Sequence, residues 1–192
     1  MKQIRFISKK PNRRAGIISG LLKGEIPEGS KVLDIGSGPG VVGCQVAKDY
    51  KSQVHGLDIK DRNTASISFK VYDGEHMPFK DQEFDIGLLI FTLHHTKDPD
   101  QVLKEAKRVC RKIIILEDLY ATKLDFLLLA LNDIIFNTFT INRETKLPFN
   151  FRTIAGWKHI FDKLGLMVEK KKIGLKVGGF FPISHVLFVL TK

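Results

Sequence analysis

The sequence has little cysteine and no apolar run long enough to cross a membrane. Cys44 and Cys110 are its only cysteines, and they show no Cys-x-x-Cys spacing, which favours two reduced structural thiols. The apolar stretch Leu127–Ile135 is interrupted by Asp133. The basic start "MKQIRFISKKPNRRAG" lacks the apolar core and small-residue cleavage site of a secretory signal. We therefore expect a cytoplasmic protein without a transmembrane segment.

Internal repeats and low-complexity linkers are also absent from the sequence. The chain has 192 residues, of which 43% are hydrophobic and 27% are charged, as in ordinary globular proteins. This length predicts one domain, residues 1–192, with a sizeable core.

The net charge of +10 is unevenly distributed. Residues 1–30 and 158–192 each carry seven basic and two acidic side chains, whereas residues 31–157 carry seventeen of each. Basic surfaces attract nucleic acid and anionic lipid. The basic residues here are mostly lysines without the interleaved aromatic side chains of RNA-binding segments. We therefore favour a solvated surface and keep a nucleic-acid interface as the alternative.

Short β-rich runs alternate with helical stretches, which is typical of an α/β fold with a mostly parallel sheet. The predicted strands are Lys31–Ile35, Gln53–Asp58, Ser66–Tyr72, Phe84–Phe91, Lys112–Glu117, Leu166–Gly174 and Ser184–Leu190. The predicted helices are Arg13–Lys23, Val41–Tyr50, Pro99–Cys110, Leu124–Phe139 and Thr153–Leu164. Asp98 followed by Pro99 is a typical helix start, and Gly165 is a typical helix end.

Two segments differ from the usual alternation. Only seven residues separate Asp58 from Ser66, which is too few for a crossover helix, so a turn or a single helical turn is expected. The predicted helix Leu124–Phe139 is apolar on nearly all sides, which favours a buried core helix. A lid over an apolar site and a helix on a membrane surface are the alternatives.

The stretch "VLDIGSGPG" joins the first predicted strand to the next helix. Glycine lets the backbone pass close to a ligand, and ligands bind at the carboxyl ends of the strands in open α/β sheets. The run "GPGVVG" matches the dinucleotide pattern Gly-x-Gly-x-x-Gly, but its first glycine comes two residues late and it leaves Asp34 unexplained. In the alternative reading, the ligand turn is "GSGPG" and Asp34 lies within the preceding strand. A buried carboxylate there suits a cationic ligand group better than a pyrophosphate.

Acidic residues also end the next two predicted strands. Asp58 lies 22 residues after Gly36, where a carboxylate accepts both ribose hydroxyls, and Ile59 is placed to pack on an adenine. Asp73 is placed to accept from an exocyclic amine, although an Asp-Gly pair with Gly74 is also typical of a simple turn.

These motifs, in this order, resemble class I S-adenosylmethionine-dependent methyltransferases, especially those of ubiquinone and menaquinone biosynthesis. The resemblance rests on "VLDIGSGPG", "HGLDIK", "VYDGEHMPFKDQEFDIGLLIFTLHHTKDPDQVLKEAKRV", "KIIILED" and "PFNFRTIAGWKHIFDKLGL". It implies a Rossmann-like three-layer sandwich, an α/β fold with a seven-stranded, mostly parallel sheet. The implied strand order is 3-2-1-4-5-7-6, with the last strand antiparallel. Residues 1–192 would form a single methyltransferase domain, with 1–30 as a basic helical segment and 119–165 as a helical insert on the substrate side.

The resemblance also implies a set of cofactor contacts. Asp34 would anchor the α-amino group of S-adenosylmethionine through water, and the backbone carbonyl of Phe91 would contact the same amine. Asp58 would hold the ribose, with Ile59 on the adenine. The remaining implied contacts are the turn Gly36, Ser37, Gly38 and Gly40 beside the methionine moiety, and Asp73 with Gly74 at the adenine amine.

The sulfonium already activates its methyl group, so no metal is expected. The protein must hold the nucleophile in line and remove its proton where necessary. His94, His95 and Asp118 are the candidate catalytic residues because they follow the fourth and fifth predicted strands, as does Glu117. Asn132, Asp133 and Asn137 either point polar groups toward an apolar acceptor or form a solvent-facing stripe.

The expected function is methyl transfer from S-adenosylmethionine to a small, apolar or amphipathic acceptor. The fourth strand ends in "FTLHH" rather than the [DN]PP[FYW] motif of amino-methylating DNA enzymes, and neither cysteine follows a proline as in cytosine C5 enzymes. An RNA methyltransferase that uses the basic termini, a non-catalytic S-adenosylmethionine-binding protein and an NAD-dependent oxidoreductase remain as alternatives. The sequence predicts neither the acceptor atom nor the oligomeric state.

Overall fold

The computed structural model of the chain describes residues 12–140, 148–177 and 183–192. Seven strands form one sheet in the order β3-β2-β1-β4-β5-β7-β6, as expected. The strands are β1 (Lys31–Ile35), β2 (Gln53–Asp58), β3 (Ser68–Val71), β4 (Phe84–Ile90), β5 (Cys110–Leu119), β6 (Met167–Leu175) and β7 (Ser184–Thr191). All pairs are parallel except those that β7 makes with β5 and β6. The implied Rossmann-like topology is therefore confirmed.

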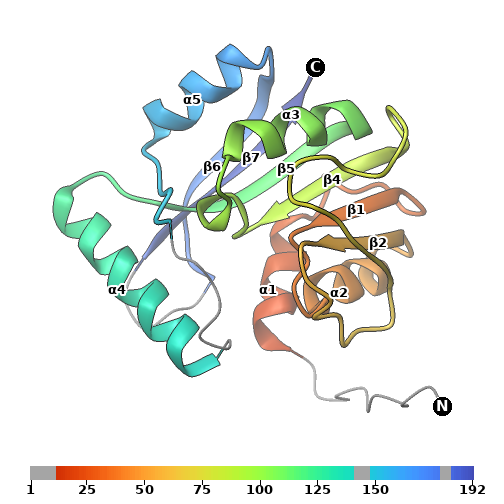
Figure 1. The fold of residues 1–192 in the computed structure, drawn as a ribbon, viewed down its shortest axis with the longest axis horizontal. Coiled ribbons are helices and arrows are strands. Elements are labelled where there is room, and N and C mark those ends of the chain that lie inside the picture. Colours follow the sequence, from red (N-terminus) through yellow and green to blue (C-terminus); the bar gives the residue numbers. More distant parts are fainter. Residues whose placement is uncertain (1–11, 141–147, 178–182) are drawn as a thin grey trace.

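Helices cover both faces of the sheet and make three layers (Figure 1). The helices are α1 (Arg13–Leu21), α2 (Val41–Asp49), the short 3-10 helix η1 (Leu93–His95), α3 (Pro99–Val109), α4 (Lys123–Thr140) and α5 (Ile154–Lys163). One core packs Trp157 and Phe161 of α5 and Leu103 of α3 against the sheet. The other packs Ile18 of α1 and Val46 of α2 against the opposite face. Among the described residues, no helix is long and apolar enough to cross a membrane.

The segment between β2 and β3 contains no helix, as its length predicted. It is held against the glycine turn instead. The Thr64 N–H donates to the Pro39 carbonyl at 3.1 Å. Asn63 accepts from the Ala65 N–H at 3.0 Å and donates to the Ile67 carbonyl at 3.3 Å. These hydrogen bonds replace the packing that a crossover helix would provide.

Two sequence predictions are wrong. The helix predicted to run through Cys110 ends at Val109, because Cys110 is fully buried with an extended backbone and begins β5. The expected core helix α4 lies beside the sheet, toward the carboxyl ends of the strands (Figure 1). Its side chains at Leu124 and Leu127 are 63% and 54% exposed, since one side of the helix has no covering layer among the described residues.

Two side chains of α3 hold the segment between β3 and β4. Glu105 accepts from the Met77 N–H at 2.9 Å and pairs with Arg108. The Arg108 guanidinium donates to the carbonyls of Met77 and Phe79 at 2.9 and 2.8 Å. This segment contains Asp73 and Gly74, so α3 positions one of the predicted ligand-binding stretches.

Replacing Arg108 with alanine should lower the free energy of unfolding by about 2 kcal/mol, because charge-assisted bonds to backbone carbonyls are lost. Urea denaturation measures the change. Arg111→Ala is the matched control, since Arg111 is exposed and lies 3.7 Å from Asp85. We expect the control to change stability by less than about 0.5 kcal/mol. Equal stabilities for the two variants would contradict this role of Arg108.

Candidate active site

The turn after β1 contains three glycines with left-handed backbone, Gly36, Gly38 and Gly40. A Cβ on Gly36 would lie 2.2 Å from the Thr92 Cγ2, and one on Gly40 would lie 2.6 Å from the Asn63 Oδ1. Side chains would thus be excluded at these two positions by the protein itself, and the expected contact of the Gly36 and Gly40 backbone with a ligand stays a prediction. No described atom lies within 4 Å of a Cβ built on Gly38. Gly38 is thus the open position of the turn.

Asp58 joins the end of β2 to this turn. Its Oδ2 accepts from the Gly38 N–H at 2.8 Å, and its Oδ1 accepts from the Ile59 N–H at 2.7 Å. Oδ1 also accepts from the Lys60 N–H at 3.4 Å, whereas Oδ2 still has a lone pair for a ligand hydroxyl. Ile59 is 56% exposed and its Cγ2 lies 3.2 Å from a Cβ built on Gly74, so an apolar side chain stands at the tip of β2.

Asp34 is buried beneath the turn. It is 2% exposed, and its Oδ2 has no hydrogen-bond partner among the described residues. Burial raises the pKa of Asp34 to about 7, against the opposing effect of a hydrogen bond from the Gly43 backbone, and the nearby charge of Asp58 raises it further. An orphaned buried carboxylate of this kind fits a cationic partner.

Ser37 lies in the same turn, between Gly36 and Gly38. Its Oγ is buried without a hydrogen-bond partner in the described part of the chain, and it lies 2.9 Å from a Cβ built on Gly56. Gly56 of β2 therefore leaves room for the serine hydroxyl. The expected contact of Ser37 with a ligand through its backbone stays a prediction.

Asp73 is an exposed turn residue. Its Oδ1 accepts from the N–H groups of Glu75 and His76, both at 2.7 Å, and these bonds hold the pKa of Asp73 below its usual value. The sequence left open whether this aspartate forms a turn or binds an adenine amine. The turn is present, and the adenine contact stays a prediction because the Asp73 Oδ2 still has acceptor capacity beyond a 3.5 Å contact with His76.

Phe91 directly follows β4 and has a strained backbone. Its φ of 52° is in the left-handed region, and its N–H donates to the Leu116 carbonyl at 2.8 Å. The ring lies edge-on to His185 at 5.2 Å, and the guanidinium of Arg14 is 4.7 Å from its centre. Strained non-glycine residues cluster at functional sites, which is consistent with the predicted ligand contact at the Phe91 carbonyl.

His94 and Glu117 form a buried pair between β4 and β5. The His94 Nδ1 lies 2.5 Å from the Glu117 Oε2, and the Glu117 Oε1 accepts from the N–H groups of Thr92 and Leu93 at 2.9 and 2.7 Å. Burial alone would lower the pKa of His94, but the charge and hydrogen bond of Glu117 raise it to about 9. His94 is 3% exposed, and its predicted catalytic role stays a prediction.

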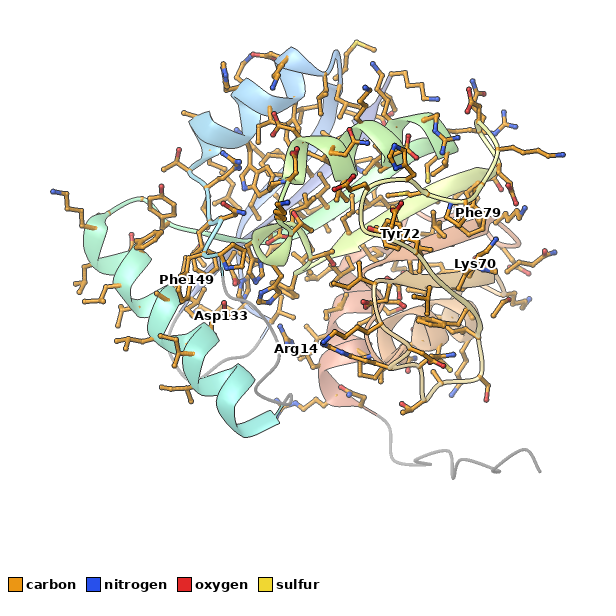
Figure 2. All side chains as sticks on the ribbon, in the orientation of Figure 1. Arg14, Lys70, Tyr72, Phe79, Asp133 and Phe149 are labelled. Atoms are coloured by element: carbon orange, nitrogen blue, oxygen red, sulfur yellow. The ribbon has the colours of Figure 1, made fainter. Side chains whose placement is uncertain are left out.

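His95 faces α4. Its Nε2 lies 3.6 Å from the Oδ1 of Asp133, which is 8% exposed and points from α4 toward the sheet (Figure 2). The His95 Nδ1 is buried and has no hydrogen-bond partner among the described residues. Burial and the neighbouring His94 lower the pKa of His95 to about 3. Asp133 thus points toward the sheet and is not part of a solvent-facing stripe on α4. The side chain of Asn137 lies outside the described part of the chain.

Asp118 pairs with a histidine that sequence reasoning missed. Its Oδ1 lies 2.8 Å from the Nδ1 of His185 in β7, and the two residues face each other in the antiparallel register. Burial would raise the pKa of Asp118, but His185, His94 and Arg14 hold it below its usual value. No local signal identifies His185, because the pairing depends on the antiparallel return of β7.

The structure therefore brings the predicted residues of β1, β2 and β4 to one edge of the sheet. Arg14 of α1 and Asp133 of α4 approach this edge from the two helices beside it (Figure 2). Thr92, Asn63 and Arg14 were not predicted, because their roles depend on contacts between distant segments. Two surface cavities of about 400 Å³ lie elsewhere, one lined by Ser30 and Asp85 and the other between α5 and β6.

Comparisons with known proteins agree with this arrangement. A family described as "Methyltransferase domain" matches residues 33–114. An uncharacterised protein from Methanocaldococcus jannaschii is 38% identical over 103 residues, which are 49% of this chain and 47% of that protein. A ubiquinone/menaquinone biosynthesis C-methyltransferase from Bartonella tribocorum is 31% identical over 96 residues, 42% of this chain and 37% of that protein. The matches thus span about half, or less, of the length of these relatives.

Solved structures share the whole fold. A Pyrococcus horikoshii protein has a TM-score of 0.68 at 23% identity, with 96% of this chain and 92% of that chain covered. A methyltransferase from Thermotoga maritima has a TM-score of 0.66 at 20% identity, with 93% and 90% covered. Together with the ordered motifs and the sheet order, these matches show that residues 33–114 resemble a methyltransferase domain and that the chain has the fold of S-adenosylmethionine-dependent methyltransferases.

Proposed function

We propose that this protein transfers a methyl group from S-adenosylmethionine to a small, apolar or amphipathic acceptor. The observation that carries the proposal is the edge formed by Asp58, Gly38 and Ile59. It combines a carboxylate with free acceptor capacity, an open backbone position and an exposed apolar side chain. The carboxylate suits the ribose of the cofactor, the open backbone position suits its methionine moiety, and the apolar side chain suits its adenine.

The buried carboxylate of Asp34 fits the cofactor for a separate reason. Its orphaned Oδ2 lies beneath the same turn, where a cationic α-amino group would favour the ionised form. The family resemblance implies that the methionine moiety of the cofactor also contacts Gly36, Ser37, Gly40 and Phe91. The bound cofactor supplies an activated methyl group, and the chain's part is to bind, orient and exclude water.

The acceptor side is formed by η1, the end of β5 and α4. Phe126, Phe151 and His94 make a continuous aromatic cluster there, with ring centres 5.0 to 5.9 Å apart. This supports an apolar acceptor. Of the candidate proton acceptors, His95 carries a buried ring nitrogen without a hydrogen bond among the described residues, whereas His94 and Asp118 are paired with Glu117 and His185. We assign positioning roles to His94 and Asp118, and His95 remains the candidate that faces the acceptor side.

Isothermal calorimetry with S-adenosylhomocysteine and with NAD tests the cofactor. We expect binding of S-adenosylhomocysteine alone, and binding of NAD alone would overturn the proposal. Product formation with apolar acceptors separates an enzyme from a non-catalytic binding protein. RNA binding that weakens steeply with salt would instead favour the RNA alternative, since basic residues that contact phosphates release counterions.

Cofactor binding should release a proton through Asp34. The pKa of about 7 in the free protein means that much of this carboxyl is protonated below pH 7, and a cationic group nearby lowers that pKa. We expect up to about one proton released per molecule bound. Calorimetry in buffers with different ionisation enthalpies measures it, and Asp34→Asn should abolish it. Equal release from both proteins would show that Asp34 does not sense the ligand.

A further inference from the structure

We propose that His94, His95 and Asp133 form a binding site for one divalent transition-metal ion. The two histidines are consecutive in η1, and the aspartate reaches them from α4. One potential ligand atom from each lies within 4.8 Å of the others. The His95 Nε2 and the Asp133 Oδ1 are 3.6 Å apart, close to the spacing of two ligands on an ion bound at about 2.0–2.2 Å.

The surroundings of His94 resemble the outer shell of a metal site. Its Nδ1 is paired with Glu117, which leaves Nε2 as the remaining ring nitrogen. Glu117 is itself held by the N–H groups of Thr92 and Leu93. Metal-binding histidines almost always have a carboxylate or carbonyl on the second nitrogen, because that contact fixes the ring and its tautomer.

His95 provides an independent observation. Its Nδ1 is buried without a hydrogen-bond partner among the described residues, and its contact with Asp133 is longer than a hydrogen bond. The His95 Nε2, rather than this Nδ1, faces Asp133, so an ion between the two residues would bind Nε2 and would join two atoms that lie too far apart for a hydrogen bond.

Charge and donor type indicate the class of ion. Asp133 and Glu117 bring two carboxylates into a buried region, and a divalent cation would replace the proton that His94 holds beside Glu117 and balance their charge. Two nitrogens and one oxygen suit zinc, cobalt, nickel or iron(II) better than magnesium or calcium, which prefer all-oxygen sites.

Three protein ligands leave a coordination position for an acceptor oxygen. An ion there would lower the pKa of an acceptor hydroxyl, whose proton would pass to solvent water. This role rests on the proposed function, whereas binding of the ion does not. It also departs from the expectation in the sequence analysis that the protein needs no metal.

Titration of the purified full-length protein with Co²⁺ alone, followed by its visible absorption bands, tests the site. We expect one equivalent to bind, with Zn²⁺ displacing it. Asp133→Asn should weaken Co²⁺ binding about 100-fold and Glu117→Gln about 10-fold. His159→Ala is the matched control, because His159 is an exposed histidine on α5 and should leave binding unchanged.

Thermal unfolding and calorimetry with S-adenosylhomocysteine on the same samples separate loss of the site from loss of the fold. Absence of stoichiometric Co²⁺ binding, or unchanged binding in a folded Asp133→Asn variant, would overturn the metal site. Failure of S-adenosylhomocysteine to bind while Co²⁺ still binds would instead overturn the proposed function and leave the metal site intact.

Discussion

Replacing Asp58 with alanine is expected to weaken S-adenosylhomocysteine binding by at least about 100-fold, because two hydrogen bonds to a charged group, together worth about 3 kcal/mol, are lost. The same change frees the Gly38 N–H, which Asp58 holds at 2.8 Å, so the turn loses its anchor. Isothermal calorimetry measures the affinity, and thermal unfolding confirms that the variant is folded.

Asp61→Asn is the control for charge. Asp61 is an exposed acid three residues farther along the chain, and its Oδ1 accepts from the Asn63 N–H at 3.3 Å. We expect its affinity for S-adenosylhomocysteine to match that of the unaltered protein. Affinity that is unchanged in Asp58→Ala, or lowered equally in both variants, would contradict the assignment of Asp58 to the ribose.

Replacing Gly36 with alanine should destabilise the protein by about 3 kcal/mol, from the strain of a left-handed residue and overlap in a packed core. The φ of Gly36 is 72°, and the new Cβ would lie 2.2 Å from the Thr92 Cγ2. Thr92 cannot yield easily, because its N–H donates to Glu117 and its Oγ1 donates to the Ile35 carbonyl. Urea denaturation measures the loss.

Gly38→Ala is the matched comparison within the same turn. It has a similar backbone, with φ of 51°, but no described atom near the new Cβ, so we expect a stability loss of only about 1 kcal/mol. Its affinity for S-adenosylhomocysteine should fall, since the methyl group would occupy the open position of the turn. Adding Thr92→Ala should restore part of the stability of Gly36→Ala and none of that of Gly38→Ala. Equal stability losses for the two glycine variants would contradict this division.

The strands and the edge at which their acidic ends meet were predictable because both depend on local patterns, whereas the strand order was implied by the family resemblance. A short apolar strand that ends in an acidic residue or a glycine turn can be identified from a few consecutive residues. β1 and β2 were predicted to the residue for this reason. Asp34 and Asp58 followed, because the carboxyl ends of adjacent parallel strands meet at one edge.

The region that we propose holds the acceptor was less predictable. The histidines of η1 were identified, but their partners Glu117 and Asp133 were named only as separate candidates, and His185 was not found. Each pairing joins residues more than twenty positions apart, so it depends on strand order and on where α4 lies. The apolar pattern of α4 wrongly predicted a buried core helix. A sequence does not show whether a helix packs on the face of a sheet or lies beside it.

The amino-acid sequence alone determined the alternation of strands and helices, the acidic strand ends and the resemblance to methyltransferases, since all of these follow from hydrophobic period and short motifs. Only the tertiary structure decided which glycines serve the protein and which one is left open. It also decided which carboxylate each histidine meets. The physical reason is that close contacts such as that between Gly36 and Thr92 arise when distant strands align, and local sequence does not encode that alignment.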